Sequence, residues 1–110
     1  MSADNDVLVV FCTFPDIGQA RQIGTVLVER QLAACVNLLE GVESIYRWEG
    51  VVETAAEVLG VIKTTRAAYP ALEAALRDLH SYQVPELLAL PVVAGLDAYV
   101  EWVGKQTRGG

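Results

Sequence analysis

Histidine is scarce in this sequence: His80 is the only one in 110 residues. A mechanism that needs an imidazole base must therefore use His80, and Cys12 is the nucleophile that the expected topology brings near it. The chain also lacks a glycine-rich phosphate loop, a G-x-S-x-G elbow, an H-E-x-x-H helix and a C-x-x-C pair. We expect no enzyme activity, and a thiol mechanism that uses Cys12 and His80 ranks last among the functions considered.

Positive charge and long apolar runs are also lacking. Eight Lys and Arg stand against fourteen Asp and Glu, a net charge of −6 without a basic cluster, so nucleic acid is not an expected partner. The longest apolar run, residues 7–12, is far too short to span a bilayer. We expect a cytoplasmic protein that does not bind membranes, with its two cysteines as free thiols.

Apolar residues, in contrast, are abundant. They make up 53% of the chain, above the usual share of roughly 45–50%. A chain of this length forms one core, so residues 1–110 are expected to be a single domain. A small domain has a large surface relative to its volume and therefore little interior in which to bury an excess of apolar residues. The excess predicts that another copy of the chain covers part of the surface.

The order of apolar patterns predicts four strands and three helices. The segments expected are a strand over 7–14, a helix over 17–31, a hairpin over 34–48 and 51–64, a helix ending near 80, an edge strand over 87–93 and a short helix from 96. Asp16 and Gln19 are spaced as a capping box for the first helix, and Pro70 fits only in the first turn of the second. Residues 53–59 have helical composition inside the returning strand, and the tail from Lys105 is expected to fray.

A βαββαβ order with a short C-terminal helix predicts an α+β, ferredoxin-like fold, with strand order 4-1-3-2 and helices on one face. Chain direction then brings several chemically active side chains to one end of the sheet: Cys12, Tyr46, Trp48, Glu53, His80 and Glu86. Cys35 falls at the other end, so a disulfide with Cys12 is not expected.

Each of these side chains has a structural alternative. His80 could be a cation at a helix C-terminus, Cys12 a packing residue, and Tyr46 and Trp48 contacts to a partner subunit. Glu53 and Glu57 could be solvated on one strand face, and Lys63 could pair with a carboxylate. A thiolate and an imidazole together favour Cu(I) or Zn(II), although two ligands leave a tetrahedral site open for Glu86, water or a neighbouring chain.

Five segments, in order and at matching spacing, resemble the CutA divalent-cation tolerance proteins over nearly the whole chain. They are CTFPD at 12–16, LAACVN at 32–37, SIYRWEG at 44–50, IKT at 62–64 and HSYQVPEL at 80–87, followed by Tyr99 and Trp102. The resemblance implies a ferredoxin-like subunit in a tight homotrimer, a link to copper tolerance and no established enzyme activity.

The resemblance also implies metal ligands: a strand-one cysteine and two adjacent histidines at the end of helix two. Cys12 and His80 match the cysteine and the second histidine, whereas Leu79 and Ser81 depart from the pattern. Because leucine cannot coordinate, we expect weakened copper binding, possible zinc binding and no metal requirement for folding.

The intact segment around Tyr82, Pro85 and Glu86 keeps a second function open, a trimeric small-ligand sensor or adaptor that resembles the PII-like signalling proteins, with clefts between subunits. The side chains expected to line such a cleft are Tyr46, Trp48, Glu53, Glu57, Lys63, Tyr82 and Glu86.

Overall fold

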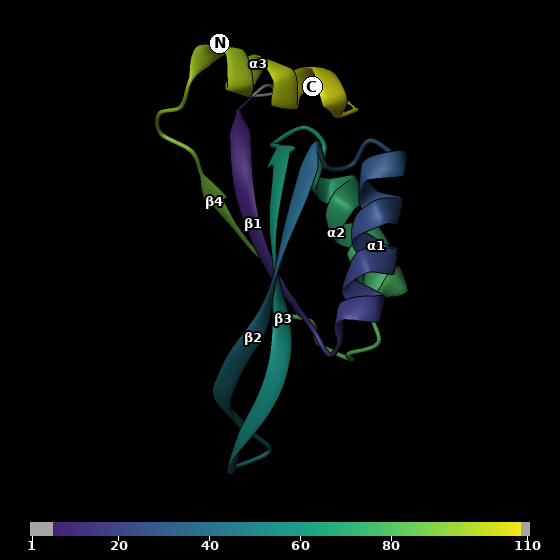
Figure 1. Cartoon of the computed structure of the whole chain (residues 1–110), viewed down its shortest axis with the longest axis vertical. Helices are drawn as coiled ribbons and strands as arrows, with labels where there is room; N and C mark the ends of the chain where they lie inside the picture. The colour runs from purple at the N-terminus through teal and green to yellow at the C-terminus, as the bar shows by residue number, and fades with distance from the viewer. Residues whose placement is uncertain (1–5, 109–110) are drawn as a thin grey trace.

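The computed structural model describes residues 6–108, which form one four-stranded antiparallel sheet with three helices (Figure 1). The elements are β1 (Val7–Phe14), α1 (Ile17–Glu29), β2 (Cys35–Trp48), β3 (Val51–Thr65), α2 (Tyr69–Leu79), β4 (Leu88–Pro91) and α3 (Asp97–Gln106). The strand order β2-β3-β1-β4 confirms the expected ferredoxin-like arrangement. Helices α1 and α2 lie side by side against one face, and α3 lies across one end of the sheet.

Alternate residues of β1 build the core between the sheet and the helices. Leu8, Val10, Cys12 and Phe14 face α1 and α2 and are at most 5% exposed. The residues between them lie on the opposite face, which the helices leave open, and Val9 and Phe11 are only half-buried there. An apolar run without alternation predicts a strand buried on both faces, whereas the helices of this subunit cover only one face of β1.

The hairpin of β2 and β3 is much longer than the rest of the sheet. β1 pairs with β3 only from Val58 to Thr65, so residues 51–57 pair with β2 alone and form a projecting two-stranded ribbon (Figure 1). Glu49 and Gly50, with φ of 50° and 80°, make the two-residue turn at its tip, as primed hairpin turns require. The helical composition of residues 53–59 is overridden, because cross-strand pairing satisfies their backbone in the sheet.

Two further expectations about local structure are corrected. The Asp16 carboxylate accepts from the Gln19 backbone N–H at 2.7 Å, but the Gln19 side chain accepts from the Ser81 hydroxyl at 3.0 Å, so the capping box is half formed. Strand β4 is shorter than expected, because its pairing with β1 spans only the four positions from Leu88 to Pro91.

The tail does not fray at Lys105 as expected. Helix α3 continues to Gln106, Thr107 is buried with its hydroxyl 3.3 Å from that of Thr65, and the Arg108 N–H donates to the Gln31 carbonyl at 2.8 Å. These contacts hold the segment to the sheet, and the rest of the expected fraying falls on 109–110, outside the described residues. None of the helices between residues 6 and 108 is long and apolar enough to cross a membrane.

Candidate functional site

The only histidine is buried behind the end of β1. His80 follows the last residue of α2 and is 7% exposed, with its ring stacked on Phe14 at 5.2 Å and tilted against Tyr82 at 4.7 Å. Its Nε2 lies 2.7 Å from the Thr13 carbonyl oxygen, which can only accept, so Nε2 carries the proton. Nδ1 accepts from the Tyr82 backbone N–H at 3.1 Å. The ring is therefore neutral, and both of its nitrogens are engaged.

Cys12 is also enclosed by protein. Its side chain faces the helices and is fully buried, with Sγ 3.8 Å from the Thr13 carbonyl oxygen. Burial raises the pKa of the thiol to about 12, and the carboxylates of Glu86 and Glu57 add to the increase. Cys12 consequently stays protonated near neutral pH.

A soft metal at Cys12 and His80 has to displace the thiol proton and an existing hydrogen bond of the ring in this conformation. A metal needs a thiolate and a free imidazole lone pair, whereas the thiol is protonated and the Nδ1 lone pair already accepts from Tyr82. Leu79, the residue before His80 in the chain, supplies no donor atom. Across residues 6–108, no three His, Cys, Asp or Glu side chains are placed to hold a metal ion together.

A cleft of about 580 Å³ lies where the projecting ribbon meets the loop between α2 and β4. Six of the seven side chains expected to line a ligand cleft are there: Tyr46, Trp48, Glu53, Glu57, Tyr82 and Glu86. Lys63 lies elsewhere, paired with Cys35 across β2 and β3 and hydrogen-bonded to the Asn37 side chain.

Sequence reasoning missed the remaining lining residues, which are Thr13, Ser44, Ile45, Gln83 and Val84. Ser44 and Ile45 stand directly before Tyr46, and Gln83 and Val84 lie between Tyr82 and Glu86. Their position next to predicted cleft residues in the chain was thus the signal that could have placed these four in the cleft. The position of Thr13 beside Cys12 gave no indication of its place in the cleft.

One hydrogen bond connects the two walls of this cleft. The Tyr82 hydroxyl in the loop donates to Glu57 Oε2 in β3 at 2.7 Å. Burial and then this bond raise the pKa of Tyr82 well above its ordinary value, because the carboxylate favours the protonated phenol. Tyr82 thus stays a neutral donor and fixes the Glu57 carboxylate in the cleft wall.

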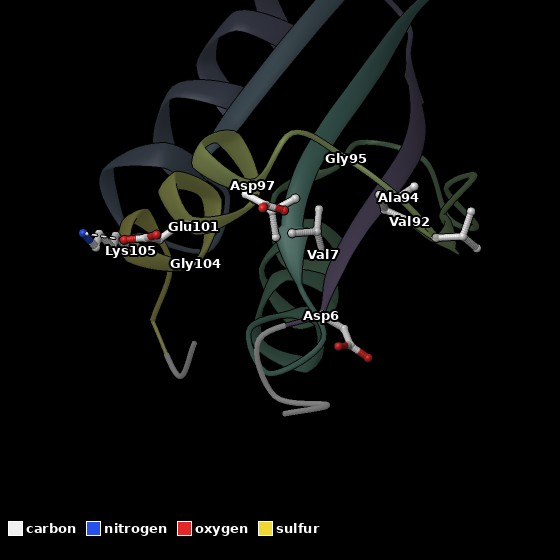
Figure 2. A pocket seen from close by; sticks show the side chains of 11 residues that line it. Asp6, Val7, Val92, Ala94, Gly95, Asp97, Glu101, Gly104 and Lys105 are labelled. Atoms are coloured by element: carbon white, nitrogen blue, oxygen red, sulfur yellow. Dashed lines mark ion pairs between the residues drawn. The ribbon is translucent and has the colours of Figure 1, made fainter. Parts of the chain in front are cut away.

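A second hollow, of about 780 Å³, lies at the other end of the sheet between the start of β1, residues 92–95 and α3 (Figure 2). Three of its four charged side chains form ion pairs on the protein itself, Glu101 with Lys105 at 3.0 Å and Asp6 with Arg66 at 3.6 Å, and Asp97 is the fourth. Its lining contains no aromatic or hydroxyl side chain. The smaller cleft, where carboxylates and hydroxyls converge, is therefore the stronger candidate site.

Comparison with known proteins gives a family match over most of the chain. The family model described as CutA1 divalent ion tolerance protein matches residues 8–106. The divalent-cation tolerance protein CutA of Thermus thermophilus is 46% identical over 99 residues, covering 90% of this chain and 96% of that protein. Protein CutA of Homo sapiens is 44% identical over 102 residues, 93% of this chain and 57% of that protein. The chain thus spans little more than half the length of its mammalian and plant relatives, including 56% of the chloroplastic Protein CutA of Arabidopsis thaliana.

Solved structures agree with the sequence comparison. CutA1 of Thermus thermophilus matches with a TM-score of 0.90 at 44% identity, covering 92% of this chain and 98% of that one. CutA1 of Oryza sativa matches with a TM-score of 0.92 at 39% identity, covering 97% and 98%. The names of similar proteins include both chloroplastic and periplasmic members, so a cytoplasmic location stays a prediction.

Proposed function

This chain belongs to the CutA1 divalent ion tolerance family, and from that membership we propose that it acts in divalent-cation tolerance as a homotrimer that binds a cationic ligand in the cleft. The observation that carries the proposal is the charge of the cleft lining. Glu53, Glu57 and Glu86 supply three carboxylates, and no Lys, Arg or His lines the same cleft.

The charge of the cleft favours a cation over an anion or a neutral ligand. A carboxylate and a unit cation 4 Å apart attract by about 4 kcal/mol at the effective dielectric constant near a protein surface, and a divalent ion doubles that attraction. The described side chains contain no chelating group of three, so water or a neighbouring subunit completes the coordination in this proposal. Carboxylate and hydroxyl oxygens suit Mn(II) or Mg(II) better than Cu(I).

The open face of the sheet supports the homotrimer. In the register of the strands, Phe11 lies beside Val61 of β3 and Leu88 of β4, which makes an apolar row across the face without helices. Leu88 is 65% exposed and Leu90, the next residue of β4 on this face, 46%. A contiguous apolar surface of this kind marks an interface, and covering it with two further copies accounts for the apolar excess in the composition.

The projecting ribbon of β2 and β3 also exposes apolar side chains that a partner subunit would cover. Ile45 and Val52, which belong to its two strands, are 68% and 61% exposed, and residues 51–57 have only β2 as a neighbour in the sheet. A two-stranded ribbon with one face in solvent has little independent stability. A neighbouring subunit packed against the ribbon would stabilise it and add a wall to the cleft.

Copper or zinc at Cys12 and His80 stays a prediction. It requires ionisation of a buried thiol and displacement of either the Thr13 carbonyl or the Tyr82 N–H from the ring. The second candidate function is the small-ligand sensor, and for this acidic cleft a small organic cation is the ligand that it would take. The volume of about 580 Å³ and the aromatic walls of Tyr46 and Trp48 favour it, since small-molecule sites span roughly 300–1,000 Å³.

Calorimetric titration of the purified protein with Mn(II), Zn(II) and Cu(II), and competition titration with Cu(I), test these assignments. Glu53→Gln and Glu86→Gln should each weaken binding of a divalent ion by about tenfold, or 1.4 kcal/mol. Glu29→Gln, at the exposed end of α1, is the matched control and should leave affinity unchanged. Unchanged affinity in both cleft variants overturns the acidic cleft, and loss of Cu(I) binding in Cys12→Ser establishes the soft-metal site instead.

A further inference from the structure

The side chain that matches a copper ligand in the family has another task in this chain. We infer that His80 is a positioning residue, whose neutral ring ties the loop between α2 and β4 to the end of β1 and so places the Tyr82 hydroxyl on Glu57 in the cleft. The inference rests on the proposed function for its effect on ligand affinity, but its structural part can be measured without a ligand.

The first contact of the ring is with β1. Pairing between β4 and β1 ends at Phe11 and Leu88, so β4 does not reach Thr13. His80 Nε2–H donates to the Thr13 carbonyl at 2.7 Å and supplies a hydrogen bond beyond the end of β4. The two residues are 67 positions apart in the chain, and this bond therefore fixes the end of α2 against the sheet.

The second contact sets the position of Tyr82. Nδ1 accepts from the Tyr82 N–H at 3.1 Å, and the two rings lie 4.7 Å apart, so His80 holds both the backbone and the side chain of that residue. The Tyr82 hydroxyl then reaches Glu57 Oε2 at 2.7 Å. Contacts thus run from Thr13 through His80 and Tyr82 to Glu57.

The position of His80 relative to the cleft separates this role from ligation. Thr13, Tyr82 and Glu57 all line the cleft, whereas His80 does not, so the ring stands behind the wall that it braces. Phe14, which is fully buried, stacks on the ring at 5.2 Å with an interplanar angle of 15°. A ligand in the cleft would meet Tyr82 and Glu57 rather than the imidazole.

Substitutions that keep or remove individual hydrogen bonds test this role. Glutamine can donate from the place of Nε2, asparagine can accept at the place of Nδ1, and alanine does neither. Mn(II) and Zn(II) titrations should show about a tenfold loss of affinity in His80→Ala and in Tyr82→Phe, and less than about threefold in His80→Gln. His80→Ala combined with Tyr82→Phe should lose about tenfold rather than a hundredfold, because one residue acts through the other.

Denaturant unfolding without metal of the unsubstituted protein, His80→Ala, Tyr82→Phe and their double variant supplies the second measurement. Non-additive losses of stability in His80→Ala and Tyr82→Phe confirm the coupling even if no variant binds a cation, in which case the proposed function fails and the positioning role stands. Additive losses overturn the positioning role. If His80→Gln and His80→Ala lose the same affinity for the metal ion, and the stability losses of His80→Ala and Tyr82→Phe are additive, then His80 is a ligand and not a positioning residue. If His80→Ala does not fold, His80→Asn, which removes the donor to the Thr13 carbonyl, replaces it in the same cycle.

Discussion

Gly60→Ala is expected to destabilise the protein through the residues that support the cleft. Gly60 lies opposite Cys12 in the pairing of β3 with β1. A Cβ atom at this position would lie 2.9 Å from Phe14 Cε2 and 3.3 Å from the Cys12 carbonyl oxygen. The Phe14 ring is fully buried and stacked on His80, so it cannot move away without disturbing its neighbours.

The size of the effect follows from two opposing contributions. Overpacking a well-packed core costs about 1–3 kcal/mol. Replacing glycine by alanine reduces the conformational entropy of the unfolded chain and returns about 0.4–1 kcal/mol. The midpoints of these ranges, about 2 and about 0.7 kcal/mol, leave a net loss of about 1.3 kcal/mol. With an unfolding entropy of about 2.1 cal/mol/K per residue, each kcal/mol lowers the melting temperature of a chain of this length by roughly 4 °C.

Thermal and denaturant unfolding at one fixed protein concentration measure this loss, because assembly would make stability depend on concentration. Gly104→Ala is the matched control. A Cβ atom on Gly104 meets no other atom within 4 Å, and alanine inside helix α3 should stabilise it by about 0.5–1 kcal/mol. If Gly60→Ala is as stable as the unsubstituted protein while Gly104→Ala behaves as expected, the close approach of Phe14 to β3 is refuted.

Three further predictions concern pH, the cleft bond and assembly. The folded Cys12 pKa is raised from 9.0 to about 12, so the unfolded thiol ionises first, and stability should fall as pH rises above 9 by up to about 1.4 kcal/mol per pH unit. Urea unfolding at several pH values above 9 should show a smaller loss of stability per pH unit in Cys12→Ala than in the unsubstituted protein. Equal losses in the two proteins contradict the raised pKa of Cys12. Tyr82→Phe removes the donor to Glu57 and should lower the unfolding free energy by about 1–3 kcal/mol, whereas an unchanged denaturation midpoint would show that this bond contributes nothing. Sedimentation at micromolar concentration should show a trimer without monomer. Phe11→Asp should dissociate the trimer. Trp48→Ala should weaken the assembly by about 2 kcal/mol or more if Trp48 anchors the interface. A well-folded monomer of the unsubstituted protein disproves the assembly.

Much of the fold could be predicted because the deciding signals are local or follow from chain direction. The apolar run of β1, the Asp16 cap of α1 and the turn at Glu49 and Gly50 all appear where expected. The order of elements then gave the sheet topology, which in turn brought Tyr46, Trp48 and Glu53 to the same cleft as Tyr82. The length of β4 and the anchored tail escaped prediction, since both depend on contacts with residues far away in the chain.

The sequence by itself determined which side chains reach the cleft end of the sheet, because element order fixes the direction of every strand. Only the tertiary structure decided their chemical state. The sequence left His80 open between a cation at a helix C-terminus and a metal ligand or base, whereas in the structure the Thr13 carbonyl and the Tyr82 N–H occupy both of its nitrogens. The sequence left Cys12 open between a packing residue and a nucleophile or ligand, and in the structure burial and two carboxylates raise its pKa and keep it protonated near neutral pH. Hydrogen-bond partners and desolvation come from segments distant in sequence, so the availability of a lone pair or a thiolate is a property of the packed fold.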